Sequence, residues 1–298
     1  PLEWRAPMTL VFQTLVDGLV LGGIYALAAV GFSLIFGVLH VINLSHGVLI
    51  LIGAYLALVL SNALNIDPLL TLPLVMIALF GVGYVYQRFL IQHTIGRTPL
   101  GSMLLTFGVA LMLQNVMIWV FSPDMKNITP SYAFNSFKIA GLTFDAVRVS
   151  ALVASLVLLS CLALLLKFSN LGRLIRATAQ QTLAAQLCGV NVRHVYALTF
   201  AVSAAFAGAA GIVIGVILPF SPADEALWTL NAFVVVVLGG VGSPAGALLG
   251  GLLLGVVNTF TAQYVGPSFP NVTMFLMLVL LLLVRPHGLL GHAFSASR

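Results

Sequence analysis

Long uninterrupted runs of apolar residues recur along this sequence, and they restrict its fold more than any other feature. A helix needs about 20 apolar residues to cross a hydrocarbon core of about 30 Å, and runs near this length occupy residues 71–91, 102–121, 149–166 and 198–218. Hydrophobic residues make up 61% of the chain and charged residues only 6%, too few to cover a water-soluble surface. The alternating segments of a membrane β-barrel are missing from the sequence. We therefore predict an all-α, polytopic transmembrane helical bundle, formed as one domain by residues 1–298.

The longest polar interruption, residues 167–197, sets the expected orientation of the bundle. It contains no acidic residue and four positive charges, on Lys167, Arg173, Arg176 and Arg193. Because cytoplasmic loops of membrane proteins carry an excess of Lys and Arg, we place this segment on the cytoplasmic side. Within it, residues 176–187 predict a short amphipathic surface helix, with Leu183 and Leu187 on its apolar face and Gly189 just beyond its end.

The remaining polar segments are expected to alternate between the two sides of the membrane, as this orientation requires. Two more regions are expected to be cytoplasmic because they are basic: the loop with Arg88, His93 and Arg97, and the C-terminus with Arg285, His287 and His292. The segment 122–147 has balanced charges, which suits the external side. We place the acidic pair Asp224 and Glu225 in another external loop.

Two interruptions lack the charges of an ordinary aqueous loop. Residues 39–47, LHVINLSHG, separate the apolar stretch 8–38 from the run 48–60, which is too short to cross a membrane alone. Residues 239–246, GGVGSPAG, break the apolar run between 231 and 260. Exposed backbone at membrane depth is tolerated only where it is packed in protein or lines a wet cavity. We therefore predict discontinuous or re-entrant helices at both places.

The two interruptions share a spacing that suggests an internal repeat. Ser45 is followed eight residues later by Gly53, and Ser243 is followed eight residues later by Gly251. Inverted repeats with interrupted helices at matching places are common in transporters. A duplication of residues 9–97 and 197–292 is one interpretation; chance matches among the small residues of membrane helices are the other.

The sequence offers little chemistry of its own. It has no G-x-x-x-x-G-K-[ST] loop, so this chain is not expected to cradle ATP phosphates by itself, and we predict no cofactor or metal in this chain. Neither H-E-x-x-H nor G-x-S-x-G is present, which argues against an intramembrane enzyme with catalytic residues. An ion-coupled transporter would usually bury acids, and Asp17 is the only acid that we find within an apolar run. Basic loops explain the net charge of +5 without nucleic-acid binding.

Four blocks of the sequence together resemble a known family. They are GLVLGGIYALAAVGFSLIFGVLHVINLSHGVLILIGAY at 18–55, LGRLIRATAQQTLAAQLCGVNVRHVYALTFAVSAAFAGAAG at 171–211, AFVVVVLGGVGSPAGALLGG at 232–251 and LLLLVRPHGLLG at 280–291. In this order they look like the LivH-type permease subunits of branched-chain amino acid ABC transporters. Related permeases serve urea, amides and other small solutes, which remain alternative substrates.

The resemblance implies a set of partners and a place in the cell. A permease of this type sits in the bacterial inner membrane with a second, related permease or a second copy of itself. Two cytoplasmic ATPases that bind ATP drive the pair, and an extracytoplasmic solute-binding protein delivers the solute. Import by alternating access is the function that follows.

The resemblance also implies a coupling segment that contacts an ATPase. The family pattern there is Glu-Ala-Ala followed, after three further residues, by Gly, and Ala184, Ala185 and Gly189 match it. Leu183 stands where the pattern has its acid, which puts an acid contact at this position in doubt. Arg173 and Arg176 are candidates to meet acidic groups on the ATPase or lipid phosphates, although the positive-inside rule alone also explains them.

For the translocation path we select polar residues and glycines at the two interruptions. A zwitterion crossing the membrane needs hydrogen-bonding groups in place of water, while an aliphatic side chain needs only apolar walls. His46 has a second interpretation, as a hydrogen-bonded packing residue. The predicted path residues are Asn43, Ser45, His46, Gly242 and Ser243.

Overall fold

The structure is a computed structural model that describes residues 5–95, 99–139, 142–285 and 288–290. It confirms a polytopic all-α bundle, with eight helices long and apolar enough to cross a membrane among the described residues. Three short 3₁₀ turns lie at Pro68–Thr71, Ile91–His93 and Pro222–Asp224. The helices are α1 (Arg5–Leu39), α2 (His46–Leu64), α3 (Leu72–Phe89), α4 (Pro99–Phe121), α5 (Ala146–Phe168), α6 (Asn170–Gln180), α7 (Thr182–Leu187), α8 (Val192–Ile217), α9 (Glu225–Gly239), α10 (Pro244–Tyr264) and α11 (Pro270–Val284).

Helix α8 forms the centre of the bundle. Its most apolar window is 94% buried, and it packs against α1, α2 and α3. Small residues allow this contact: a Cβ at Gly211 would overlap the carbonyl oxygen of Ile50, and one at Gly53 would overlap the backbone of Gly208. Close backbone approach through small residues is the usual way in which membrane helices associate. Much of the interior is therefore held by direct contact between helix backbones.

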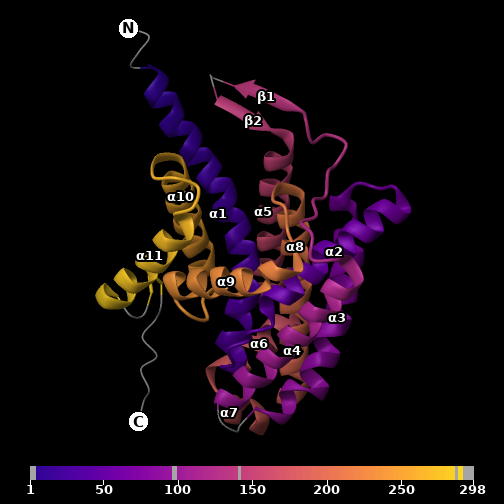
Figure 1. The fold of residues 1–298 in the computed structure, drawn as a ribbon. Helices are drawn as coiled ribbons and strands as arrows, with labels where there is room; N and C mark the ends of the chain where they lie inside the picture. Colours follow the sequence, from indigo (N-terminus) through magenta and orange to yellow (C-terminus); the bar gives the residue numbers. More distant parts are fainter. Residues whose placement is uncertain (1–4, 96–98, 140–141, 286–287, 291–298) are drawn as a thin grey trace.

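Two regions mark opposite ends of the bundle (Figure 1). Helices α6 and α7 lie at one end, and a hairpin of β1 (Ser136–Ile139) and β2 (Leu142–Asp145) lies at the other. The strands are antiparallel, with Phe137 opposite Phe144. The sequence did not predict this hairpin. Lys167, Arg173, Arg176 and Arg193 are all exposed, in or next to the segment that contains α6 and α7.

Both expected interruptions are present, but one flanking helix is longer than predicted. Chain segment 40–45 separates α1 from α2, and segment 240–243 separates α9 from α10. The run 48–60 is part of α2, whose 19 residues are long enough to cross a membrane. Residues 61–64 continue this helix, and it ends at Asn65 in a left-handed conformation with φ 56°. Helix α9 lies crosswise to the long helices in Figure 1.

The last helix, α11, is too short to count as a membrane span. Helix α11 has 15 residues and is not among the eight membrane-crossing candidates. At 1.5 Å per residue it is about 22 Å long, less than a hydrocarbon core. Three basic residues used to orient the chain, Arg97, His287 and His292, lie outside the described residues, as does the end of the C-terminus.

Candidate functional site

Three of the predicted path residues lie together in the interior, at the start of α2. Asn43, Ser45 and His46 are all almost fully buried. The Ser45 hydroxyl donates to Asn43 Oδ1 at 2.6 Å, and the Tyr86 hydroxyl lies 3.0 Å from Ser45 Oγ. Because the single Ser45 proton is used by Asn43, Tyr86 is the donor in the second bond. Tyr86, on α3, thus extends the predicted group by a residue that the sequence analysis missed.

His46 fits the packing interpretation and still leaves a free polar atom. Its Nε2 lies 2.7 Å from the carbonyl oxygen of Ala28 on α1, so this nitrogen carries the proton and donates. The edge of its ring packs against Phe32, with centroids 5.5 Å apart. Nδ1 of His46 and Nδ2 of Asn43 are buried and have no hydrogen-bond partner among the described residues. His46 therefore links α2 to α1, and two buried polar atoms of the group have no hydrogen-bond partner among the described residues.

Threonines on two other helices support the non-helical backbone of segment 40–45. Thr106, on α4, accepts a hydrogen bond from Leu44 N at 3.1 Å. Thr229, on α9, accepts from Gly47 N at 2.8 Å and donates to Leu44 O at 3.3 Å. These bonds satisfy backbone groups that a membrane interior would otherwise leave unpaired. Neither threonine stands out in the sequence, because isolated threonines are ordinary in apolar helices.

The other two predicted path residues lie at the start of α10. Gly242 is exposed and has φ 78°, and Ser243 caps α10 by accepting from Gly246 N at 3.0 Å. Gly242 lies against Gly37 near the end of α1. Within the described part of the chain, no hydrogen bond joins Ser243 to Asn43, Ser45 or His46. The predicted path residues therefore form two groups, and Ser45 and Ser243 each stand directly before a helix.

An acid that was expected in an external loop is buried instead. Glu225 is 4% exposed and is the first residue of α9. It lines a cavity of about 340 Å³ between α1, α4, α9 and segment 40–45. The expectation that Asp17 is the only acid within an apolar segment is therefore wrong. Asp224 at the N-cap position and Glu225 directly after it are typical of a helix start, and that signal was available in the sequence.

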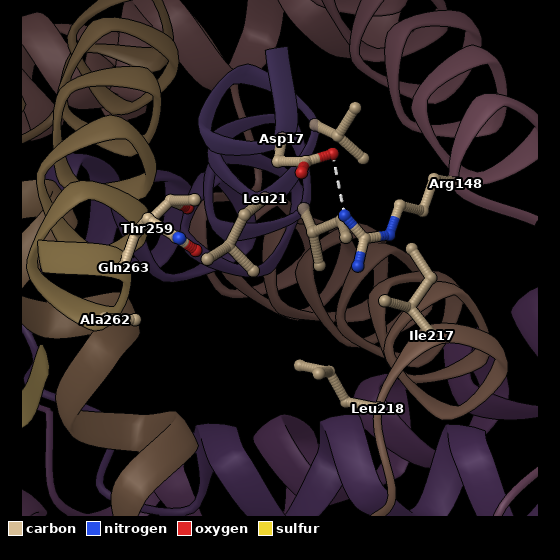
Figure 2. Close-up of a pocket in the computed structure, with 10 residues that line it drawn as sticks. Asp17, Leu21, Arg148, Ile217, Leu218, Thr259, Ala262 and Gln263 are labelled. Atoms are coloured by element: carbon tan, nitrogen blue, oxygen red, sulfur yellow. Dashed lines mark ion pairs between the residues drawn. The ribbon is translucent and has the colours of Figure 1, made fainter. Parts of the chain in front are cut away.

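A second cavity opens near the hairpin end, between α1, α5, α8 and α10 (Figure 2). Asp17 and Arg148 face each other there, with Arg148 Nη1 2.7 Å from Asp17 Oδ1. Leu21, Ile217 and Leu218 form apolar walls. The ion pair joins α1 to α5 beside the hairpin, so the one acid that the sequence singled out is paired.

Gln13 connects the same ion pair to the hairpin. Its Nε2 donates to Thr143 O at 2.9 Å, and its Oε1 accepts from Thr143 N at 3.0 Å. Nε2 also reaches Asp17 Oδ1 at 3.3 Å. Arg148 bonds Asp145 at the end of β2, at 3.3 Å. The hairpin is thereby fixed to the adjacent ends of α1 and α5.

The predicted coupling segment forms two helices rather than one. The helix expected over 176–187 is split at Gln181, whose extended backbone separates α6 from α7. In α7, Ala185 is buried and Ala184 half-buried, while Leu183 is 67% and Leu187 82% exposed. The apolar face of this helix therefore points away from the rest of the chain.

Gly189 ends α7 in the way that the sequence predicted. Its φ is +83°, a left-handed conformation that favours glycine. Gly189 N donates to Gln186 O at 2.9 Å, and Val190 N donates to Ala185 O at 3.0 Å. This pair of bonds is a Schellman motif, which satisfies the last carbonyls of the helix and turns the chain toward α8.

Comparison with known proteins shows to which family this chain belongs. The model of a family described as the branched-chain amino acid transport system permease component matches residues 14–285. This chain belongs to that permease family. The permease is 33% identical to the branched-chain amino acid transport permease BraD of Pseudomonas aeruginosa, with 94% of this chain and 95% of the relative covered.

Two further relatives come from Escherichia coli. The permease is 30% identical to LivH, over 94% of this chain and 95% of the relative. It is 26% identical to LivM, a second permease protein, over 94% of this chain and 71% of the relative. No solved structure matches. The relatives are transport permeases, and with eight membrane-crossing candidates among its described residues this chain is a multi-pass membrane protein.

Arg173 and Arg176, which were predicted to take part in coupling, have partners within the chain of this permease. Arg176 donates to the carbonyl oxygens of Leu166 and Lys167, the last turn of α5. Arg173 donates to Asn170 Oδ1 at the start of α6. Both side chains are exposed at the same time. Arg176 thus caps a helix C-terminus, where a positive charge is favourable.

Proposed function

We propose that this permease is one of two permease subunits of an ATP-driven, ABC-type importer for branched-chain amino acids in the bacterial inner membrane. Its partner is a related permease or a second copy of this chain. Two ATPases bind and hydrolyse ATP on the cytoplasmic side, and a solute-binding protein delivers the amino acid from outside. The match over residues 14–285 to permeases of branched-chain amino acid transport carries this proposal.

We infer that the end with α6 and α7 faces the cytoplasm. The positive-inside rule supports this orientation, because Lys167, Arg173, Arg176 and Arg193 are exposed there. The opposite end carries the hairpin and the acids Asp17 and Asp145. In this orientation the hairpin and the cavity beside Asp17 and Arg148 face the solute-binding protein.

We propose that α7 contacts the ATPase. Leu183 and Leu187 are apolar and largely exposed on a helix outside the eight candidate spans. An apolar helix face that enters a groove of its partner is a common recognition mode. Leu183, where the family pattern has an acid, then contributes apolar contact in place of charge. Arg173 is available to acidic groups of the ATPase or to lipid phosphates.

The amino acid is proposed to pass beside the two interruptions. Closure of the ATPases would move α6 and α7 and rock the spans around segments 40–45 and 240–243, which gives alternating access. Asn43, Ser45, His46, Gly242 and Ser243 remain the proposed path residues. The unused Nδ2 of Asn43 and Nδ1 of His46 support this role, since a polar solute needs such groups at membrane depth.

Uptake by the reconstituted transporter tests the proposal. The permease, its partner permease, both ATPases and the binding protein are placed in liposomes, and uptake of labelled leucine is measured with and without ATP. We expect uptake only when ATP and the binding protein are both present, with competition by isoleucine and valine. Uptake without ATP, or uptake of urea or acetamide in preference to leucine, would contradict the proposal.

A further inference from the structure

Glu225 is a buried acid that has no ion-pair partner among the described residues, inside a segment apolar enough to cross a membrane. The residue is 4% exposed, and it lies in the candidate span Pro222–Gly239. Its Oε2 has no hydrogen-bond partner in the described part of the chain. The two ion pairs found there involve Arg148 and not Glu225. A buried acid within a membrane is costly, and such residues usually serve a function.

The surroundings of Glu225 form a cavity of the size that small ligands use. Its volume of about 340 Å³ falls in the range of about 300–1,000 Å³ that is typical of small-molecule sites. The walls are otherwise apolar apart from Thr229 and consist of Phe32, Ile42, Leu44, Met103, Phe107, Ala226, Leu230 and Phe233.

Glu225 is the only group on these walls with an unused polar side-chain atom among the described residues. The hydroxyl of Thr229 already accepts from Gly47 N and donates to Leu44 O. The cavity therefore has one carboxyl-bearing residue beside aliphatic and aromatic surface. That combination suits a small molecule with a positively charged group next to an apolar chain.

The position of Glu225 in its helix offsets part of the cost of burying a carboxylate. It is the first residue of α9, where free backbone N–H groups and the helix dipole favour a carboxylate. It also borders the interruption before α2: a Cβ on Gly47 would overlap the carbonyl oxygen of Glu225. The backbone of Glu225 thus lies against Gly47, the residue that follows His46.

We propose that Glu225 and its cavity form a subsite that binds the primary ammonium group of the transported amino acid, while the apolar walls receive its side chain. This assignment rests on the proposed import of branched-chain amino acids. Two alternatives compete with it: a basic residue of the second permease pairs with Glu225, or the acid stays protonated and serves packing only.

Transport by Glu225→Gln tests the charge at nearly constant size. In liposomes with the complete transporter, at saturating loaded binding protein, we expect leucine uptake to fall by roughly tenfold, the effect of losing one charge-assisted hydrogen bond. ATPase activity stimulated by the binding protein should persist. Glu225→Asp should retain part of the uptake, and Asp124→Asn, at an exposed acid, should retain all of it.

The outcomes separate this inference from the proposed function. Uptake by Glu225→Gln at the wild-type rate would overturn the ammonium subsite and leave the importer intact. Absence of ATP-dependent uptake by the wild-type complex would overturn the proposed function itself.

A labelling experiment decides the case in which Glu225→Gln fails to assemble. The wild-type complex is treated with dicyclohexylcarbodiimide, an apolar reagent for buried carboxyl groups, and the adduct at Glu225 is measured by peptide mass spectrometry. We expect leucine to suppress the adduct and 4-methylpentanoate, which lacks the ammonium group, to leave it unchanged. An adduct that leucine does not suppress would overturn the proposal.

Discussion

At the scale of single residues, the interior depends on hydroxyl groups that satisfy backbone atoms of another helix. Thr229 is the strongest case, since its Oγ1 binds both Gly47 N and Leu44 O at the start of α2. Without it, a buried N–H and a buried carbonyl would each lose a partner. An unsatisfied buried group costs about 1–3 kcal/mol.

Thr229→Val is therefore expected to lower the free energy of unfolding by about 1–3 kcal/mol, although it keeps the side-chain volume. Thr229→Ser should be close to the wild type, because the hydroxyl remains. The matched control is Thr273→Val, whose hydroxyl bonds only a carbonyl near its own helix, Phe269 O. The measurement is reversible unfolding of the purified permease in mixed micelles. Equal stability of Thr229→Val and the control would refute the role of the hydroxyl.

The sequence identified some of these residues and could not identify others. Asn43, Ser45 and His46 were visible because they interrupt apolar runs without any charge. Tyr86, Thr106 and Thr229 were not, because the residues that they bind are 41, 62 and 182 positions away along the chain. We placed Glu225 in an external loop because of its charge alone. Its burial depends on how α9 packs against α1 and α2.

At the scale of elements, sequence patterns predicted the spans better than the short segments. The run 102–121 corresponds to α4 and the run 198–218 to most of α8. Helix α8 starts earlier, at Val192, because Asn191 caps it by accepting from His194 N at 3.2 Å. The hairpin was missed because strands of four residues have no clear periodicity. The duplication of residues 9–97 and 197–292 stays a prediction.

Helix α7 gives a prediction at this scale. Leu187 is 82% exposed, so Leu187→Ser should leave the fold intact. If α7 docks in an apolar groove, the affinity of the permease pair for the ATPases should fall about tenfold, a loss of about 1.4 kcal/mol. Co-purification of the ATPases at graded concentrations measures this change. The control is Phe134→Ser, a 92% exposed apolar residue just before the hairpin. If Leu187→Ser and the control bind the ATPases equally well, α7 is not the docking element.

At the scale of the whole molecule, the proposed coupling depends on the difference between the two ends of the bundle. Figure 1 shows α6 and α7 at one end and the hairpin at the other. Exposed basic residues lie in or next to α6 and α7, and the cavity beside Asp17 and Arg148 lies near the hairpin. Coupling to ATPases requires the first end to face the cytoplasm. The membrane orientation therefore links the charge pattern of the sequence to the proposed mechanism.

Labelling of Cys188 tests this orientation most directly. Cys188 directly follows α7 and is exposed, and Cys161→Ala leaves it as the only cysteine of the chain. A membrane-impermeant maleimide added to intact spheroplasts should leave Cys188 unmodified and should label it in inverted membrane vesicles. A cysteine placed at the exposed Phe134 should show the opposite pattern. Labelling of Cys188 from outside intact spheroplasts would contradict the orientation and, with it, the coupling role of α6 and α7.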